Sequence, residues 1–180
     1  MAETGWTFAG SGADNSTGPF SGVAWTNPSN VTADDNATVT ISFPQTSTGL
    51  FAGTFGFSIP VGATIDGVEV RTRRYAGGMG SGNSVNVRLA VASVATSDAT
   101  HDNTVVWSGS EEVVTHGGAA DTWGESLTPA ICNASGFGYI INVATGGPFG
   151  SADVDSMEMN ITYTEGAGGG ASNLIILGAG

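Results

Sequence analysis

Lysine is absent from this sequence of 180 residues, and only four arginines stand against 16 aspartates and glutamates. The resulting formal net charge of −12 repels phosphate groups. The missing lysine also removes the phosphate-loop lysine and Schiff-base chemistry. We therefore expect neither a nucleic-acid partner nor a membrane partner.

Cysteine occurs once, as Cys132, which excludes an internal disulfide and argues against most thiolate metal sites. No run reaches the roughly 18 apolar residues needed to cross a membrane. Residues 1–5 have neither the basic nor the apolar region of an export signal. We expect synthesis in the cytoplasm without export.

Catalytic signatures are also missing, because the chain contains neither a GxSxG elbow nor an HExxH pair. His101 and His116 lie in polar stretches without zinc-like spacing, and we interpret both as surface or turn histidines. A Ser/His/Asp triad leaves no trace in sequence, since its members meet only in the fold. We expect a protein that is not an enzyme and binds no cofactor; a carboxylate-pair glycosidase is a distant alternative.

Charged residues make up only 11% of the chain, whereas about 25% is usual for a soluble domain. The mean hydropathy is slightly positive. Acidity favours solubility at high local density. Part of the surface is therefore expected to be covered by copies of the protein or by a partner.

Glycine is abundant, with 29 residues, and β-branched and aromatic residues fill the runs between glycine clusters. Period-two alternation or short apolar runs predict strands at residues 37–43, 50–59, 65–74, 85–94, 104–107, 113–118, 137–143 and 153–163. No segment has a helical apolar period over three turns. The prediction is an all-β fold, an antiparallel β-sandwich or jelly roll of about eight strands.

Residues 55–74 are predicted to form the central hairpin of this sandwich. Pro60 ends the first strand because proline has no N–H to give to a ladder. Gly67 shifts the phase of the alternation in the second strand, which indicates a β-bulge. The last strand is expected to bury the face of Met157 and Met159 and to expose the face of Glu158.

The predicted sandwich covers residues 25–165. Residues 1–24 form an N-terminal arm or edge strand, and residues 166–180 combine a glycine-rich linker with an apolar tail. That tail would be an aggregation hazard in a free monomer. It either folds back as a last strand or adds to a neighbouring subunit by β-augmentation, and we favour the second because the linker gives reach. The inter-subunit contacts expected from these features are Leu174, Ile175, Ile176, Leu177, Trp6, Phe8, Arg71, Arg73 and Arg74.

Two oxygen-rich stretches, residues 34–36 and 153–155, could ligate calcium, which takes six to eight oxygen ligands. Turn chemistry of Asp and Asn is the favoured interpretation. Clustered Arg71, Arg73 and Arg74 are expected to pair with carboxylates on an adjacent strand or copy.

Trp25, Trp107 and Trp123 stand beside glycine or proline at predicted strand ends. Large rings at such positions plug the ends of a sandwich core. Core packing or packing between subunits is favoured over stacking on a sugar.

Several motifs together resemble a family of small structural proteins of tailed bacteriophages and prophages. They are Trp25-x-Asn27-Pro28-x-Asn30, Phe57-x-Ile59-Pro60-x-Gly62-Ala63-x-Ile65-x-Gly67-Val68-x-Val70, Gly117-Gly118-x-x-Asp121-x-Trp123-Gly124, Phe137-Gly138 and Val154-Asp155. The resemblance covers about residues 25–163. It implies a β-sandwich on the virus particle, either a capsid decoration (cement) protein or a tail or fibre component.

We therefore expect a non-enzymatic bacteriophage virion structural protein, above all a capsid decoration protein that forms homo-oligomers such as trimers. Binding to the assembled shell, and not to free subunits, would stabilise the shell by mass action. The expected partners are the major capsid protein or another virion protein, and the expected location is the virion, assembled in the host cytoplasm. The alternative is a carbohydrate-binding jelly-roll module, or a tail or fibre component that attaches to host glycans.

Overall fold

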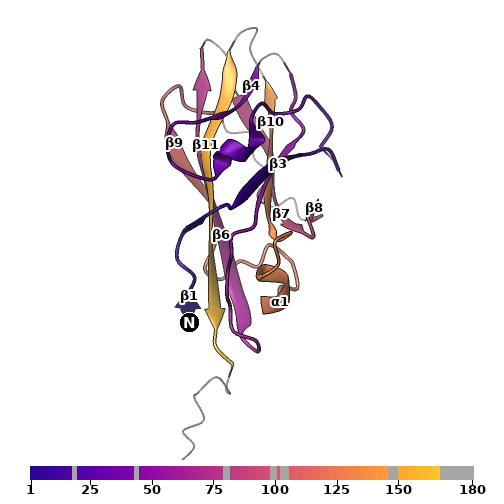
Figure 1. The fold of residues 1–180 in the computed structure, drawn as a ribbon, viewed down its shortest axis with the longest axis vertical. Coiled ribbons are helices and arrows are strands. Elements are labelled where there is room, and N and C mark those ends of the chain that lie inside the picture. Colours follow the sequence, from indigo (N-terminus) through magenta and orange to yellow (C-terminus); the bar gives the residue numbers. More distant parts are fainter. Residues whose placement is uncertain are drawn as a thin grey trace, which may run out of the picture.

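Two antiparallel sheets pack face to face in the computed structural model, which describes residues 1–17, 20–42, 45–78, 82–97, 101, 106–145 and 150–166 (Figure 1). The predicted all-β sandwich is confirmed, with several short strands in the described residues beyond those expected and with β6 and β11 longer than expected. In these residues the elements are β1 (Ala2–Glu3), β2 (Thr7–Phe8), β3 (Ser11–Asn15), η1 (Pro28–Val31), β4 (Val39–Ser42), β5 (Gly49–Gly53), β6 (Thr64–Gly77), β7 (Gly82–Val91), β8 (Val94–Ala95), β9 (Glu112–Gly118), α1 (Pro129–Cys132), β10 (Gly138–Thr145) and β11 (Ser151–Thr164).

The six-stranded sheet is built around β6 and β11, which pair along their whole length. The other edge of β11 is paired by β1, β2 and β4 and by an isolated bridge between Thr32 and Ser156. The N-terminal residues are therefore edge strands. Figure 1 shows β1 beside the C-terminal end of β11, so both ends of the described chain lie at the same end of the sandwich.

The five-stranded sheet has the order β3-β5-β10-β7-β8. Its inward side chains meet those of β6 and β11 in the core. Trp25, Trp107 and Trp123 all belong to this core, with exposed fractions of 3%, 3% and 1%. The prediction that these three rings pack inside the sandwich is confirmed.

The predicted central hairpin is wrong, because β5 and β6 belong to different sheets. The segment between them crosses from one sheet to the other, with Thr54 at φ 58° and Gly56 at φ 72°. Residues 55–59 form no strand; instead the Asn133 side chain accepts from the Ile59 N–H and donates to the Ile59 carbonyl, both at 2.9 Å. Phe55 and Ile59 are buried in the core, so burial without strand pairing explains the apolar run.

The bulge predicted at Gly67 is confirmed. Thr162 faces Gly67 and Tyr163 faces Ile65, so Asp66 is the extra residue on β6. A second bulge lies on β11, where Val154 faces Arg74 and Ser156 faces Arg73. Asp155 is its extra residue, and the apolar alternation changes phase at this point, from Ala152 and Val154 to Met157 and Met159.

The last strand buries both of its faces, contrary to the prediction of one polar, exposed face. Glu158 and Asn160 have exposed fractions of only 5% and 4%. They are covered because the paired segments on both edges of β11 carry long side chains, among them Arg71, which lies 2.6 Å from Glu158.

Helix α1 is four residues long, too short for a periodic signal in the sequence. Thr128 caps it by accepting from the Ile131 N–H, and Pro129 occupies the first turn. Among the described residues, no helix has the length and apolar character required of a membrane span.

Candidate functional site

A face of exposed aromatic and aliphatic side chains around an arginine lies on the outside of the six-stranded sheet. We call the set Trp6, Phe8, Arg71, Val113 and Glu158 the Trp6 face. The exposed fractions of Trp6, Phe8 and Val113 are 36%, 41% and 45%. The Arg71 guanidinium lies over the Trp6 ring, 4.3 Å from its centroid. The same guanidinium forms an ion pair with Glu158 at 2.6 Å.

Strand register builds the Trp6 face. Phe8 lies opposite Glu158, and Glu158 lies opposite Arg71. Directly opposed residues on antiparallel strands point to the same side of the sheet. Val113 lies opposite Arg73, which shares its face with Arg71. The sequence had marked Trp6, Phe8, Arg71 and Arg73 as contact residues, and the structure places these four on one side of one sheet.

Arg73 is surrounded by carboxylates that are distant in sequence. Its guanidinium lies 2.9 Å from Asp34 and 2.8 Å from Glu111, and these carboxylates raise the Arg73 pKa. Asp155 lies close enough to add to that electrostatic effect.

The prediction that the clustered arginines pair with carboxylates on an adjacent strand is confirmed for Arg71, which pairs with Glu158 on β11, and for Arg74, which pairs with Glu112 on β9. The carboxylates that pair with Arg73 lie in the segments beside the sheet.

The two stretches considered for calcium meet at this point, because Asp34 and Asp155 are neighbours. Arg73 bridges two of the local carboxylates, and Asp153 accepts from Thr40 at 2.6 Å. In the part of the chain that the structure describes, no group of three or more His, Cys, Asp or Glu is placed to hold a metal ion.

Asp155 is a buried carboxylate in an unfavourable environment. Its exposed fraction is 0%, and neither carboxylate oxygen has a hydrogen-bond partner among the described residues. Burial, followed by the nearby Asp34 carboxyl, raises the pKa of Asp155 to about 6. The backbone of Asn36 lowers the pKa of Asp155 and so opposes this shift. A carboxylate left unpaired in a protein interior destabilises the fold.

Arg74 is not available to another subunit, so its assignment as an inter-subunit contact is wrong. Only 2% of the residue is exposed, because alternation along β6 turns it inward where Arg73 points outward. Its guanidinium lies 4.8 Å from the centroid of the Trp107 ring, and its Nε is 3.2 Å from Glu112. Burial lowers the Arg74 pKa.

The two histidine side chains lie against the interior of the sandwich. His101 stacks on Trp123, with ring centroids 3.7 Å apart, and its Nε2 lies 2.8 Å from Asp121. His116 lies in β9, not in a surface turn as expected. Burial lowers its pKa to about 4, with further contributions from Arg74 and His101, so His116 is neutral at physiological pH.

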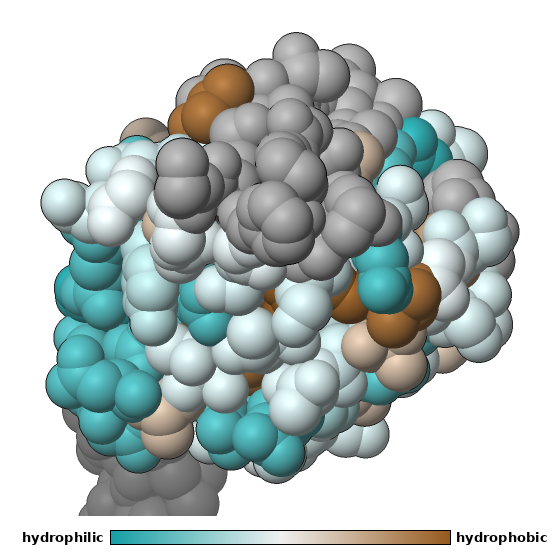
Figure 2. Space-filling view, turned by 90° about the horizontal axis from the view of Figure 1, so that it is seen from above, coloured by the Kyte–Doolittle hydropathy of each residue, from teal (hydrophilic) through white to brown (hydrophobic). Residues whose placement is uncertain are grey.

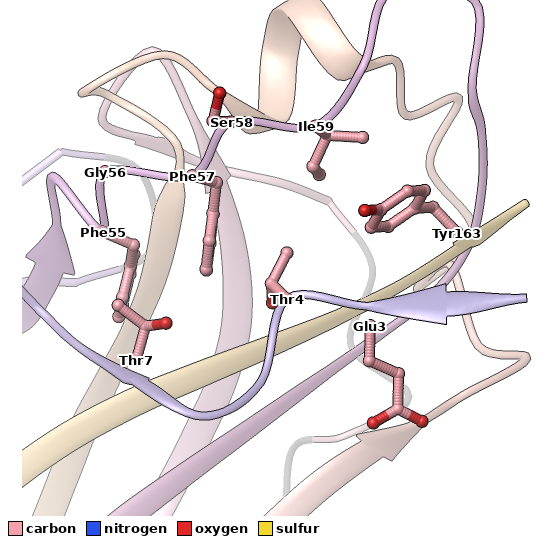
Figure 3. A pocket seen from close by; sticks show the side chains of 9 residues that line it. All are labelled: Glu3, Thr4, Thr7, Phe55, Gly56, Phe57, Ser58, Ile59 and Tyr163. Atoms are coloured by element: carbon pink, nitrogen blue, oxygen red, sulfur yellow. The ribbon is translucent and has the colours of Figure 1, made fainter. Parts of the chain in front are cut away.

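A cleft of about 320 Å³ lies beside β1, between residues 3–7 and residues 55–59. Figure 3 shows the Thr4 side chain pointing from residues 3–7 into the cleft, with Tyr163 pointing toward Ile59. Phe55 and Phe57 stack in parallel at 5.5 Å. The predicted contacts Leu174, Ile175, Ile176 and Leu177 lie outside the described residues.

The end of the sandwich that lies opposite β1 has a more hydrophilic surface than the Trp6 face. Viewed from above the fold of Figure 1, the coloured surface in Figure 2 is mostly hydrophilic to neutral, with only isolated hydrophobic residues. Scattered single apolar residues are normal on a protein surface. We take the Trp6 face and the cleft beside β1 as candidate interaction sites. A further hollow, of about 500 Å³, is lined by Val91, by residues 94–97 and 124–127, and by Ile131.

Comparison with known proteins gives a narrow result. No protein-family model matches this chain, and no curated protein matches it. A solved structure described as a xylan-binding module CBM15 aligns with 14% sequence identity, covering 91% of this chain and 94% of that chain, with a TM-score of 0.38. A similarity this low gives no information about the ligand of this protein.

Proposed function

We propose that this protein is a non-enzymatic structural component of a bacteriophage virion, a decoration protein that stabilises the capsid shell. The motif resemblance supports this role, and so does one structural observation, the Trp6 face. Interface cores are enriched in Trp, Phe and Arg, and such residues carry most of the binding energy. The neighbour covering this face would be the major capsid protein or another copy of the chain. The low charged fraction supports the same reading, because a surface that is covered in the particle needs less charge.

The location can be tested on particles from a host that carries the coding sequence. Antibodies against the protein are expected to label the shell in many copies. Particles stripped of the protein should lose their contents at a lower temperature, and added wild-type protein should restore stability. Labelling confined to the tail or fibres, or absence from particles, would contradict the proposal.

Trp6→Ala is expected to weaken this binding by about 2 kcal/mol or more, which is about 30-fold in affinity. The variant should fold normally, because Trp6 is exposed and lies at a sheet edge. Binding to stripped particles, measured by co-sedimentation, checks this. Val94→Ala is the matched control, since Val94 is exposed by 53% but lies on the other sheet. If the two variants bound with equal affinity, the Trp6 face would not be part of the interface.

The exposed indole of Trp6 also supports a second candidate function, binding of a host polysaccharide. Trp6 is exposed and is held by Arg71 in a fixed position, as a stacking platform for a sugar ring would be. If glycans are the ligand, polysaccharide should change the tryptophan emission saturably, and Trp6→Ala should abolish the change. The other three tryptophans are buried and would not respond. A decoration protein predicts no response in either form.

A further inference from the structure

The cleft beside β1 lies where the chain leaves the sandwich. Tyr163 lines the cleft, and the last described residue, Gly166, follows closely. A Cβ at Gly166 would lie 2.4 Å from the Gly62 carbonyl oxygen, so the chain passes tightly against the turn at residues 60–63. Residues 167–180 therefore begin at the end of the molecule where the cleft opens.

Both walls of the cleft have free backbone groups. In the described chain β1 pairs only with β11, which leaves its other edge open. On the facing wall, the backbone of residues 55–58 makes no hydrogen bond to another described residue. Phe57 and Tyr163 are only partly buried and give the cleft apolar surface. An extended segment with apolar side chains would pair with these backbone groups and cover this apolar surface.

We propose that this cleft binds residues 174–177 of the C-terminal tail as a short added strand. These residues, Leu-Ile-Ile-Leu, are the longest unbroken run of leucine, isoleucine and valine in the chain. Leu174 and Ile176 would lie on one face of the strand and Ile175 and Leu177 on the other. One pair would pack on Phe57 and Tyr163, while the backbone would pair with β1.

The linker is long enough. Seven residues, 167–173, separate Gly166 from Leu174, and the eight steps from Gly166 to Leu174 span up to about 27 Å when extended. Three of these seven residues are glycine and the others are small or polar, so the linker can also reverse direction. The proposal does not depend on a virus particle, because the cleft and the tail are parts of the same chain. Tails of neighbouring copies could use the same cleft, and the experiment below separates the two arrangements.

The test uses the full-length chain with the photo-reactive residue p-benzoylphenylalanine in place of Ile175. After irradiation, mass spectrometry is expected to find most cross-links on residues 3–7, 55–59 or 163. Cross-links spread over the surface in proportion to exposure would overturn the proposal. Cross-linked monomer bands would place the tail in its own chain, whereas dimer bands would place it in a neighbour. The first result would refute an inter-subunit role for the tail and leave the docking site intact.

A pair of tail variants supplies a second measurement. Ile175→Asp combined with Ile176→Asp, which places a charge on both faces of the strand, should increase the hydrogen-exchange rate of the amides of residues 3–7 and 55–58 several-fold, and Ile175→Val combined with Ile176→Val should not. A charged side chain is excluded from an apolar cleft, whereas valine keeps the packing. Neither change touches the described sandwich, so lost protection would report on docking. Identical exchange in the two variants would overturn the proposal.

Discussion

Replacing Trp123 with alanine is expected to lower the free energy of unfolding by about 3–5 kcal/mol, the range for removing a large buried ring. Trp123 is 1% exposed and forms part of the main core. Its indole Nε1 donates to the Val68 carbonyl at 2.9 Å, and His101 stacks on its ring. The variant would lose the packing and this hydrogen bond together. Chemical denaturation followed by circular dichroism measures the change.

Two further variants separate the contributions of burial and of the hydrogen bond to that loss of stability. Trp123→Phe keeps most of the ring but removes the donor to Val68, so a loss of about 1–3 kcal/mol is expected. Trp6→Ala removes the same side chain from an exposed site and should change stability much less. If Trp123→Ala were no more destabilising than Trp6→Ala, the placement of Trp123 in the core would be wrong.

Asp155→Asn is expected to stabilise the protein at neutral pH by about 3 kcal/mol. The estimate follows from the rise of the Asp155 pKa from 3.8 to about 6, at about 1.4 kcal/mol per unit. Between these two pH values the folded state binds the proton and the unfolded state does not. The contribution of Asp155 to stability is therefore best below about pH 4, and it is lost as the pH rises through 6. Asparagine is neutral throughout, and its amide can donate to Asp34.

The measurement is the difference in unfolding free energy between variant and wild type at pH 4 and at pH 7.5. The difference should be small at pH 4 and large at pH 7.5. Asp35→Asn is the control, because Asp35 is an exposed neighbour whose carboxylate accepts from the Ala37 N–H in a turn. A difference that does not grow with pH would mean that the Asp155 carboxylate is solvated or paired.

The alternation and spacing of apolar residues in the sequence correctly predicted features of the fold that depend on local burial. The phase shift at Gly67 located a bulge, and the positions of three tryptophans at strand ends predicted their burial. The same reasoning failed for residues 55–59. An apolar run indicates burial but not its means, and here the Asn133 side chain bonds the backbone of Ile59 in place of a neighbouring strand.

The candidate site was predicted only in part. Trp6, Phe8, Arg71 and Arg73 were chosen as contact residues, but nothing in the sequence placed Arg71 on Trp6, 65 residues earlier. Arg74 was assigned to the surface because it adjoins Arg73. Alternation along one strand puts neighbours on opposite faces, and the structure shows which of the two is buried.

By itself the sequence determined the acidity of this protein, its β architecture and much of its apolar core, because charge, glycine content and period-two alternation act through neighbours in the chain. Only the tertiary structure decided that β5 and β6 enter different sheets, that four segments share one edge of β11, and that Asp34 meets Asp155. Those outcomes depend on strand register between distant segments. Many registers bury the same residues, and packing of the whole core selects among them.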